Sequence, residues 1–143
     1  MRLKRFLEMR GADGGPWRRL CALPALWAGL LYHGESLDAA WDIAKDWSME
    51  ERLKLREDVP RLGLKADIRG RTVRDIAEEV IELASNGLNA RARLNAAGDN
   101  ETGFLSPLRQ VADSGETPAE RKLGLYHGQW KESVDPIFFE CSY

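Results

Sequence analysis

The first ten residues alternate between apolar and charged side chains. Leu3, Leu7 and Met9 fall on one side of an extended chain, with one arginine among them. The opposite side is mostly charged and consists of Arg2, Lys4, Phe6, Glu8 and Arg10. A repeat of two residues is the side-chain period of a β-strand, so the pattern predicts a strand over residues 2–10. The glycine-rich turn at residues 11–16 should end that strand.

The rest of the chain shows the spacing of helices. Apolar residues recur every three or four positions over residues 20–32 and again over residues 73–84, which is typical of amphipathic helices. Helix starts are predicted at Ser48, Thr72 and Thr117, because each precedes an acidic residue by three positions, as in a capping box. We therefore expect about six helices and no second strand.

A single strand cannot satisfy its backbone hydrogen bonds within a chain that is otherwise helical. An unpaired strand leaves a row of backbone donors and acceptors without partners, and even an isolated hairpin is only marginally stable. We therefore expect residues 2–10 to pair with strands outside this sequence. The predicted fold class is mainly α with one N-terminal β-strand, within a larger protein.

Composition narrows the class of protein. The chain has 143 residues, 43% hydrophobic and 31% charged, which is typical of one globular domain. A net charge of −2 favours neither nucleic acid nor a membrane surface as partner. The apolar stretch 20–32 is too short to span a bilayer and contains Pro24. The N-terminus lacks the features of a signal peptide, so a cytoplasmic location is expected.

The candidate chemistry lies at the N-terminus. Glu8 and Arg10 are two residues apart and should project from the same side of the strand. A carboxylate there could bind Mg²⁺ and a guanidinium could bind an anion, although a solvated charged face fits the same pattern. Gly14 and Gly15 allow close approach of backbone to a ligand, or form a plain turn. Trp17 could wall a pocket or belong to the core.

A family resemblance is carried by the stretch from Arg5 to Ala25, which reads RFLEMRGADGGPWRRLCALPA. It resembles the plant-type glutamate–cysteine ligases of plants and many proteobacteria. The similarity continues, in order, through Thr117-Pro118-Ala119-Glu120 and Ser133-Val134-Asp135-Pro136. It implies that the chain is the C-terminal fragment of an α+β fold like that of glutamine synthetase, with an antiparallel sheet and helices.

The resemblance also implies a reaction and its cofactors. Enzymes of this family use ATP and Mg²⁺ to join the γ-carboxylate of glutamate to cysteine through γ-glutamyl phosphate, the first step of glutathione biosynthesis. By similarity, Glu8 would be a metal ligand, and Arg10 would be catalytic and bind substrate or ATP. Trp17 would border the amino-acid pocket. Cys21 would form a regulatory disulfide with an upstream cysteine, although an inert thiol remains the alternative.

The resemblance divides the chain into an active-site strand and glycine-rich loop over residues 1–19 and a helical region over residues 20–143. The expected partners are glutamate, cysteine, the missing N-terminal part of the ligase and, as one option, a second copy in a homodimer. The chain alone is expected to be inactive. The alternative is a non-catalytic helical interaction module derived from the ligase. The arginine pairs at 69–71 and 91–93 are balanced by nearby acids, which disfavours a nucleic-acid binder.

Overall fold

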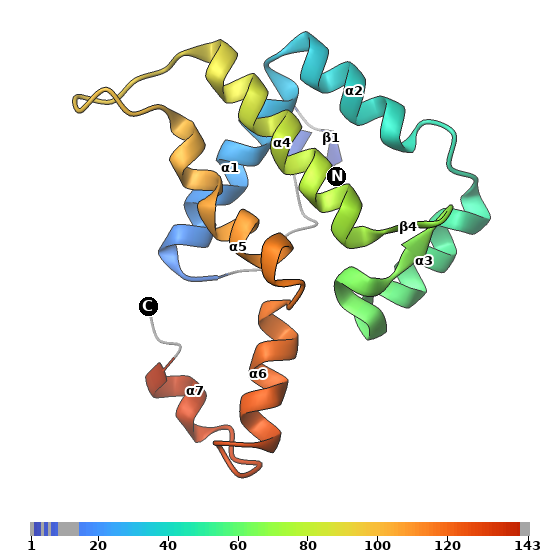
Figure 1. Ribbon diagram of the computed structural model, residues 1–143, viewed down its shortest axis with the longest axis vertical. Helices are drawn as coiled ribbons and strands as arrows, with labels where there is room; N and C mark the ends of the chain where they lie inside the picture. Colours follow the sequence, from blue (N-terminus) through green and yellow to red (C-terminus); the bar gives the residue numbers. More distant parts are fainter. Residues whose placement is uncertain (1, 4, 6, 9–14, 141–143) are drawn as a thin grey trace.

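The computed structural model describes residues 2, 3, 5, 7, 8 and 15–140. Most of these residues are helical (Figure 1). The α-helices are α1 (Trp17–Leu31), α2 (Gly34–Ala44), α3 (Met49–Leu62), α4 (Val73–Arg91), α5 (Ser106–Ser114), α6 (Pro118–His127) and α7 (Asp135–Glu140). Two short 3₁₀ helices are η1 (Gly63–Lys65) and η2 (Glu101–Leu105). The prediction of a mainly helical chain is confirmed.

The predicted helix starts are confirmed in detail. Ser48, Thr72 and Thr117 each cap a helix, and each forms a capping box with the acidic residue three positions later. In each box the side-chain oxygen accepts a hydrogen bond from the backbone N–H at the third helical position. The acidic side chain accepts one from the N–H of the capping residue. These bonds satisfy backbone donors that the first turn of a helix leaves free.

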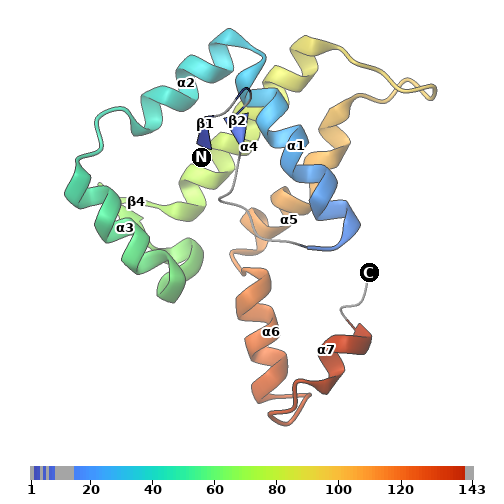
Figure 2. The ribbon, with the colours of Figure 1, turned by 180° about the vertical axis from the view of Figure 1, so that it is seen from behind.

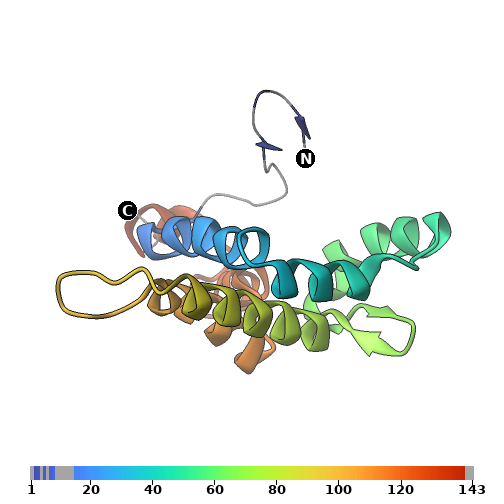
Figure 3. The same ribbon diagram turned by 90° about the horizontal axis from the view of Figure 1, so that it is seen from above.

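The core lies where α1 crosses α4. Buried residues from α1, α4, η2 and α5 form one apolar cluster: Ala25, Leu30, Ile81, Ala84, Leu88, Leu105 and Ala112. Seen from above, α1 and α2 form one layer, and α4 and α5 lie beneath it (Figure 3). Burial of this cluster removes apolar surface from water and holds the two layers together.

Two glycines bring the backbones of α1 and α4 into contact. A Cβ atom on Gly29 would lie 2.1 Å from the carbonyl oxygen of Ala84, and one on Gly87 would lie 1.9 Å from the carbonyl oxygen of Gly29. Neither position has room for a side chain. Gly87 lies inside α4, which continues unbroken to Arg91.

The predicted single strand over residues 2–10 is wrong. The segment forms two short strands, β1 (Arg2–Leu3) and β2 (Leu7–Glu8), which pair antiparallel with Leu3 opposite Leu7. A bend at Arg5 separates them. The argument that strands from outside this sequence must complete one long strand therefore loses its premise, because the segment pairs with itself.

The expectation of no second strand is also wrong. β3 (Asp67–Ile68) and β4 (Arg71–Thr72) form another antiparallel hairpin directly before α4. Its turn consists of Arg69 and Gly70, with φ angles of 54° and 76°. Positive φ at both central residues is the backbone geometry of a tight hairpin turn.

Helices α6 and α7 form an arm that points away from the layers (Figures 1 and 2). The arm has an anchor of its own, because Trp130 is only 4% exposed and its indole N–H donates to Glu140 Oε1 at 3.2 Å. Its base contacts η1, where Lys65 Nζ lies 3.8 Å from Glu120 Oε1.

Candidate functional site

The glycine-rich turn leads directly into α1. Gly15 is buried, and the stem of Arg19 lies over it, with Arg19 Cβ and Cδ each 3.3 Å from the position of a Cβ at Gly15. The carbonyl oxygen of Pro16 accepts hydrogen bonds from the backbone N–H groups of Arg19 at 2.7 Å and Leu20 at 3.2 Å. Turn and helix are thus joined by contacts that a side chain at Gly15 would disturb.

The structure places three of the four predicted site residues. Glu8 is half-buried in β2, and the hairpin stands clear of the helices on the side of α1 and α2 (Figure 3). Arg10 lies outside the described residues, so its position beside Glu8 stays a prediction. Trp17 is the first residue of α1, and its side chain is 76% exposed, which excludes it from the core of this chain.

Cys21 lies one helical turn after Trp17. Its thiol is free and its side chain is half-buried. The prediction of a regulatory disulfide stays untested, because the expected partner lies outside this sequence. Cys141 lies outside the described residues.

A cationic pocket opens beside the start of α1. Its volume is about 290 Å³, and it is lined by Arg18, Arg19, Pro107, Gln110, Val111, Ser114, Glu116, Thr117, Pro118 and Arg121. Within the described residues, no carboxylate pairs with any of the three guanidinium groups. The lining has three arginines and one acidic residue, Glu116, and this positive balance favours anions, since arginine suits carboxylate and phosphate.

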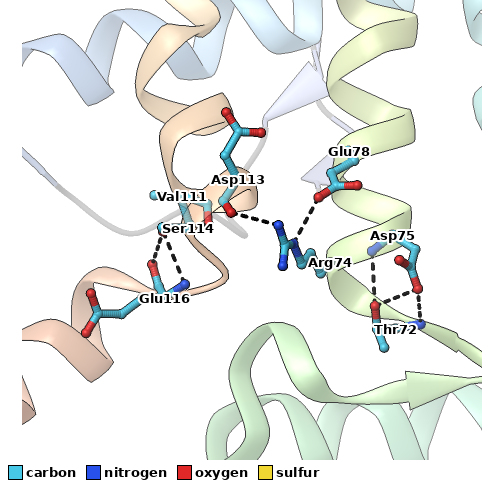
Figure 4. Close-up of polar contacts among 8 residues, drawn as sticks. All are labelled: Thr72, Arg74, Asp75, Glu78, Val111, Asp113, Ser114 and Glu116. Atoms are coloured by element: carbon cyan, nitrogen blue, oxygen red, sulfur yellow. Dashed lines mark hydrogen bonds and ion pairs between the residues drawn. The ribbon is translucent and has the colours of Figure 1, made fainter.

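A network centred on Arg74 lies at the end of α5, next to the pocket residues Ser114 and Glu116 (Figure 4). Arg74 donates from Nε to Glu78 Oε1 at 2.9 Å and from Nη2 to the backbone oxygen of Asp113 at 2.7 Å, so it joins α4 to the end of α5. Ser114 Oγ then accepts a hydrogen bond from the N–H of Glu116 at 3.2 Å. The turn between α5 and α6 is fixed in this way.

Sequence reasoning missed most of this pocket. Arg18 and Arg19 stand in the family-like stretch, but Gln110, Ser114 and Arg121 come from helices about 90 to 100 residues later. No local pattern links residues so far apart in sequence. Only the packing of α5 and α6 against the start of α1 brings them together.

Metal-ligating groups are sparse in the part of the chain that the structure describes. No three His, Cys, Asp or Glu side chains there lie close enough to share a metal ion. Mg²⁺ is often held by one or two carboxylates together with substrate phosphates and water. The role of Glu8 as a metal ligand stays a prediction.

None of the helices in the described range has both the length and the apolar character needed to cross a bilayer.

Comparison with known proteins identifies the family. The model of glutamate–cysteine ligase family 2 matches residues 1–140. The chain belongs to this family. Its relatives include glutamate–cysteine ligase A of rice (Oryza sativa subsp. indica), 56% identical over all 143 residues, and the ligases of tomato (Solanum lycopersicum) and Arabidopsis thaliana, 53% and 52% identical. The chain covers 28% of the rice ligase and 26% of each of the other two, so it spans about a quarter of their length.

The names of these relatives correct one expectation. The rice, tomato and Arabidopsis ligases are all described as chloroplastic. The predicted cytoplasmic location is therefore wrong, because it depended on the first residues of this sequence alone.

Proposed function

We propose that this chain forms part of an ATP-dependent ligase that joins the γ-carboxylate of glutamate to the amine of cysteine, the first step of glutathione biosynthesis. The observation that carries the proposal is the family match over residues 1–140, together with relatives named glutamate–cysteine ligase at 50–56% identity. The accompanying location is a plastid, as in the names of the relatives.

The proposed reaction has two steps. The γ-phosphoryl group of ATP is transferred to the γ-carboxylate of glutamate, which gives γ-glutamyl phosphate and ADP. The amine nitrogen of cysteine then attacks the acyl carbon, the bond from carbon to the phosphate oxygen breaks, and the amine loses a proton. Both steps develop negative charge on phosphoryl oxygens, which cationic side chains stabilise.

The residues of this chain take three roles in the proposal. Glu8 supplies one carboxylate for Mg²⁺, which would neutralise phosphate charge when bound. Arg10 binds a phosphate or substrate carboxylate through its planar fork. Trp17, whose side chain is open at the start of α1, borders the amino-acid pocket. The half-buried thiol of Cys21 is kept as a candidate for a regulatory disulfide.

The complete site requires more polypeptide than this sequence contains. The chain spans about a quarter of its relatives' length. Among the described residues, Glu8 is one carboxylate outside any cluster of three metal-ligating side chains, and a metal centre needs more ligands than that. We therefore propose that these 143 residues are inactive alone and form the C-terminal part of a glutamine-synthetase-like enzyme. A homodimer is compatible with this arrangement.

The test uses a chimera in which this chain replaces the matching residues of the rice ligase. Glu8→Gln should lower kcat/KM for ATP-dependent phosphate release by about 100-fold, because a neutral amide binds Mg²⁺ weakly. Melting temperature should not change. Glu57→Gln on α3, an exposed residue, is the control and should keep full activity.

Two results would contradict the proposal. Normal turnover by the Glu8→Gln chimera would show that Glu8 is not a metal ligand. A folded chimera without ligase activity, whose helical chain nevertheless captures a protein partner, would support the alternative of a non-catalytic interaction module. The exposed apolar residues of α1 are the observation that keeps this alternative in view.

A further inference from the structure

Helix α1 is apolar on two opposite sides. No charged residue occurs between positions 20 and 31. One side packs on α4 and is buried at Ala22, Ala25 and Gly29. A helix that is hydrophobic all round is ordinarily buried on all sides, so the other side of α1 calls for an explanation.

Apolar residues also lie on the side of α1 away from these buried positions. Trp17, Leu20, Pro24 and Leu31 recur at helical spacing, and we call these four residues the outer α1 face. Trp17 is 76% exposed and Leu20 is 47% exposed, Pro24 is exposed and Leu31 is half-buried. Half-buried Cys21 lies beside this face.

Two other helices, α3 and α4, carry ion pairs on their exposed sides. On α3, Lys54 forms an ion pair with Asp58, and no residue of that helix is buried. On α4, Arg74 pairs with Glu78 at 2.9 Å. The outer α1 face has no such charges. Exposed apolar residues occur on other helices too, but Trp41 of α2, which is 63% exposed, lies between Asp38 and Lys45 on its helix, whereas the outer α1 face carries no charged residue.

We infer that the outer α1 face is the surface on which the rest of the ligase polypeptide packs. The inference rests on the proposed function. The relatives have nearly three-quarters of their length beyond the part that this chain matches, which is enough polypeptide to cover a helix. An uncharged face fits the apolar interior of one folded enzyme better than a transient partner.

The position of the β1–β2 hairpin supports this occupant. The hairpin stands clear of the helices, on the same side of the two layers as α1, opposite α4 (Figure 3). Polypeptide that completes a metal site around Glu8 would therefore lie between the hairpin and the outer α1 face. Trp17, at one end of that face, would be enclosed by the same packing.

Cysteine labelling tests the inference without measuring turnover. Leu20→Cys and Leu53→Cys are matched, because Leu20 is 47% and Leu53 is 50% exposed. Each is introduced into the isolated chain and into the rice chimera, and labelling by maleimide at the new cysteine is distinguished from labelling at the native Cys21 by tandem mass spectrometry. We expect Leu20→Cys to label roughly tenfold more slowly in the chimera than in the isolated chain, with Leu53→Cys unchanged.

The outcomes separate this inference from the proposed function. Equal labelling of Leu20→Cys in both proteins would overturn it, whether or not the chimera has ligase activity. Protection in a folded but inactive chimera would support the packing surface while contradicting the catalytic proposal. Labelling of Leu20→Cys that slows only as the isolated chain is concentrated, with no protection in the chimera, would assign the face to a second copy and overturn the inference.

If the chimera does not fold, a second variant still decides. Leu20→Asp in the isolated chain should raise its solubility and lower its binding of a hydrophobic dye, because it places a charge within the outer α1 face. Leu53→Asp, at an equally exposed leucine on a helix that already carries charged side chains, should change both measurements less. Identical dye binding by both variants would show that the outer α1 face is not an accessible apolar surface.

Discussion

Thr72 closes the first turn of α4 with hydrogen bonds in both directions. Its Oγ1 accepts from the N–H of Asp75 at 3.1 Å, and Asp75 Oδ2 accepts from the N–H of Thr72 at 2.8 Å. Thr72→Ala should lower the free energy of unfolding by about 1 kcal/mol, because the backbone N–H of Asp75 loses its acceptor. Urea unfolding measures this loss. Ser106→Ala, at an exposed helix start without a side-chain cap, should stay within about 0.5 kcal/mol of the parent.

The same capping box makes this contribution depend on pH. The hydrogen bond from the Thr72 hydroxyl, followed by that from its backbone N–H, lowers the pKa of Asp75. A folded-state pKa below the unfolded value gives stability that is present above the unfolded pKa and lost as pH falls through the folded one. The difference between the parent and Thr72→Ala should therefore shrink in acid. A constant difference from pH 7 down to acid unfolding would contradict the role of the carboxylate.

Local residue patterns were predictable from the sequence, and long-range ones were not. The capping boxes at Ser48, Thr72 and Thr117 depend on residues three positions apart, so the sequence shows them directly. Arg121 reaches the pocket of Arg18 and Arg19 only through tertiary packing, which no local spacing reveals. The adjacency of Glu8 and Arg10 stays a prediction.

At the scale of elements, the crossing of α1 and α4 depends on Gly29 and Gly87, because glycine has no side chain to separate the two backbones. Gly87→Ala would put a methyl group 1.9 Å from the carbonyl oxygen of Gly29, so the helices must move apart and the core must open. We expect the free energy of unfolding to fall by about 3 kcal/mol or more, as for other severe overpacking. Thermal unfolding followed by circular dichroism measures it.

A glycine elsewhere provides the control. Gly124 lies inside α6, and a Cβ there would meet nothing within 4 Å. Gly124→Ala should therefore raise helix stability by about 0.5–1 kcal/mol. Similar destabilisation by both alanines would mean that close approach of the backbones does not explain the cost at Gly87.

The two hairpins show why the strands were predicted wrongly from the sequence. Arg5 interrupts the apolar side of the alternating segment, and the chain bends there, which divides one predicted strand into β1 and β2. The β3–β4 hairpin has only two residues in each strand, too few for a visible period. Its turn places Arg69 at positive φ, and Arg69 is held by Glu51 at 2.6 Å, a contact made across 18 residues.

At the scale of the whole molecule, the arm of α6 and α7 depends on Trp130. Trp130→Ala should release α7 from α6, because the buried indole and its hydrogen bond to Glu140 hold the two helices together. Amide hydrogen exchange over residues 118–140 should then rise by roughly tenfold or more, while exchange in α1 and α4 stays unchanged. Trp41→Ala, at a side chain that is 63% exposed, should leave the arm protected.

One experimental result would contradict this prediction for the arm. If Trp130→Ala raised exchange equally in α1, α4 and the arm, the arm would be part of one cooperative unit with the layers. The Lys65–Glu120 contact at 3.8 Å between η1 and α6 would then transmit more stability than its exposed position suggests.

The contact between Gly29 and Gly87 also determines how accurately the N-terminal end of α1 is positioned. Trp17 is twelve residues before Gly29 on one continuous helix, a span of about 18 Å at 1.5 Å per residue. A tilt of only about 5° at the contact would displace the indole by about 1.6 Å over that length. Catalytic groups lose much of their effect at displacements of about 1 Å, so a pair of glycines far from any substrate would govern the alignment of a residue proposed to touch one.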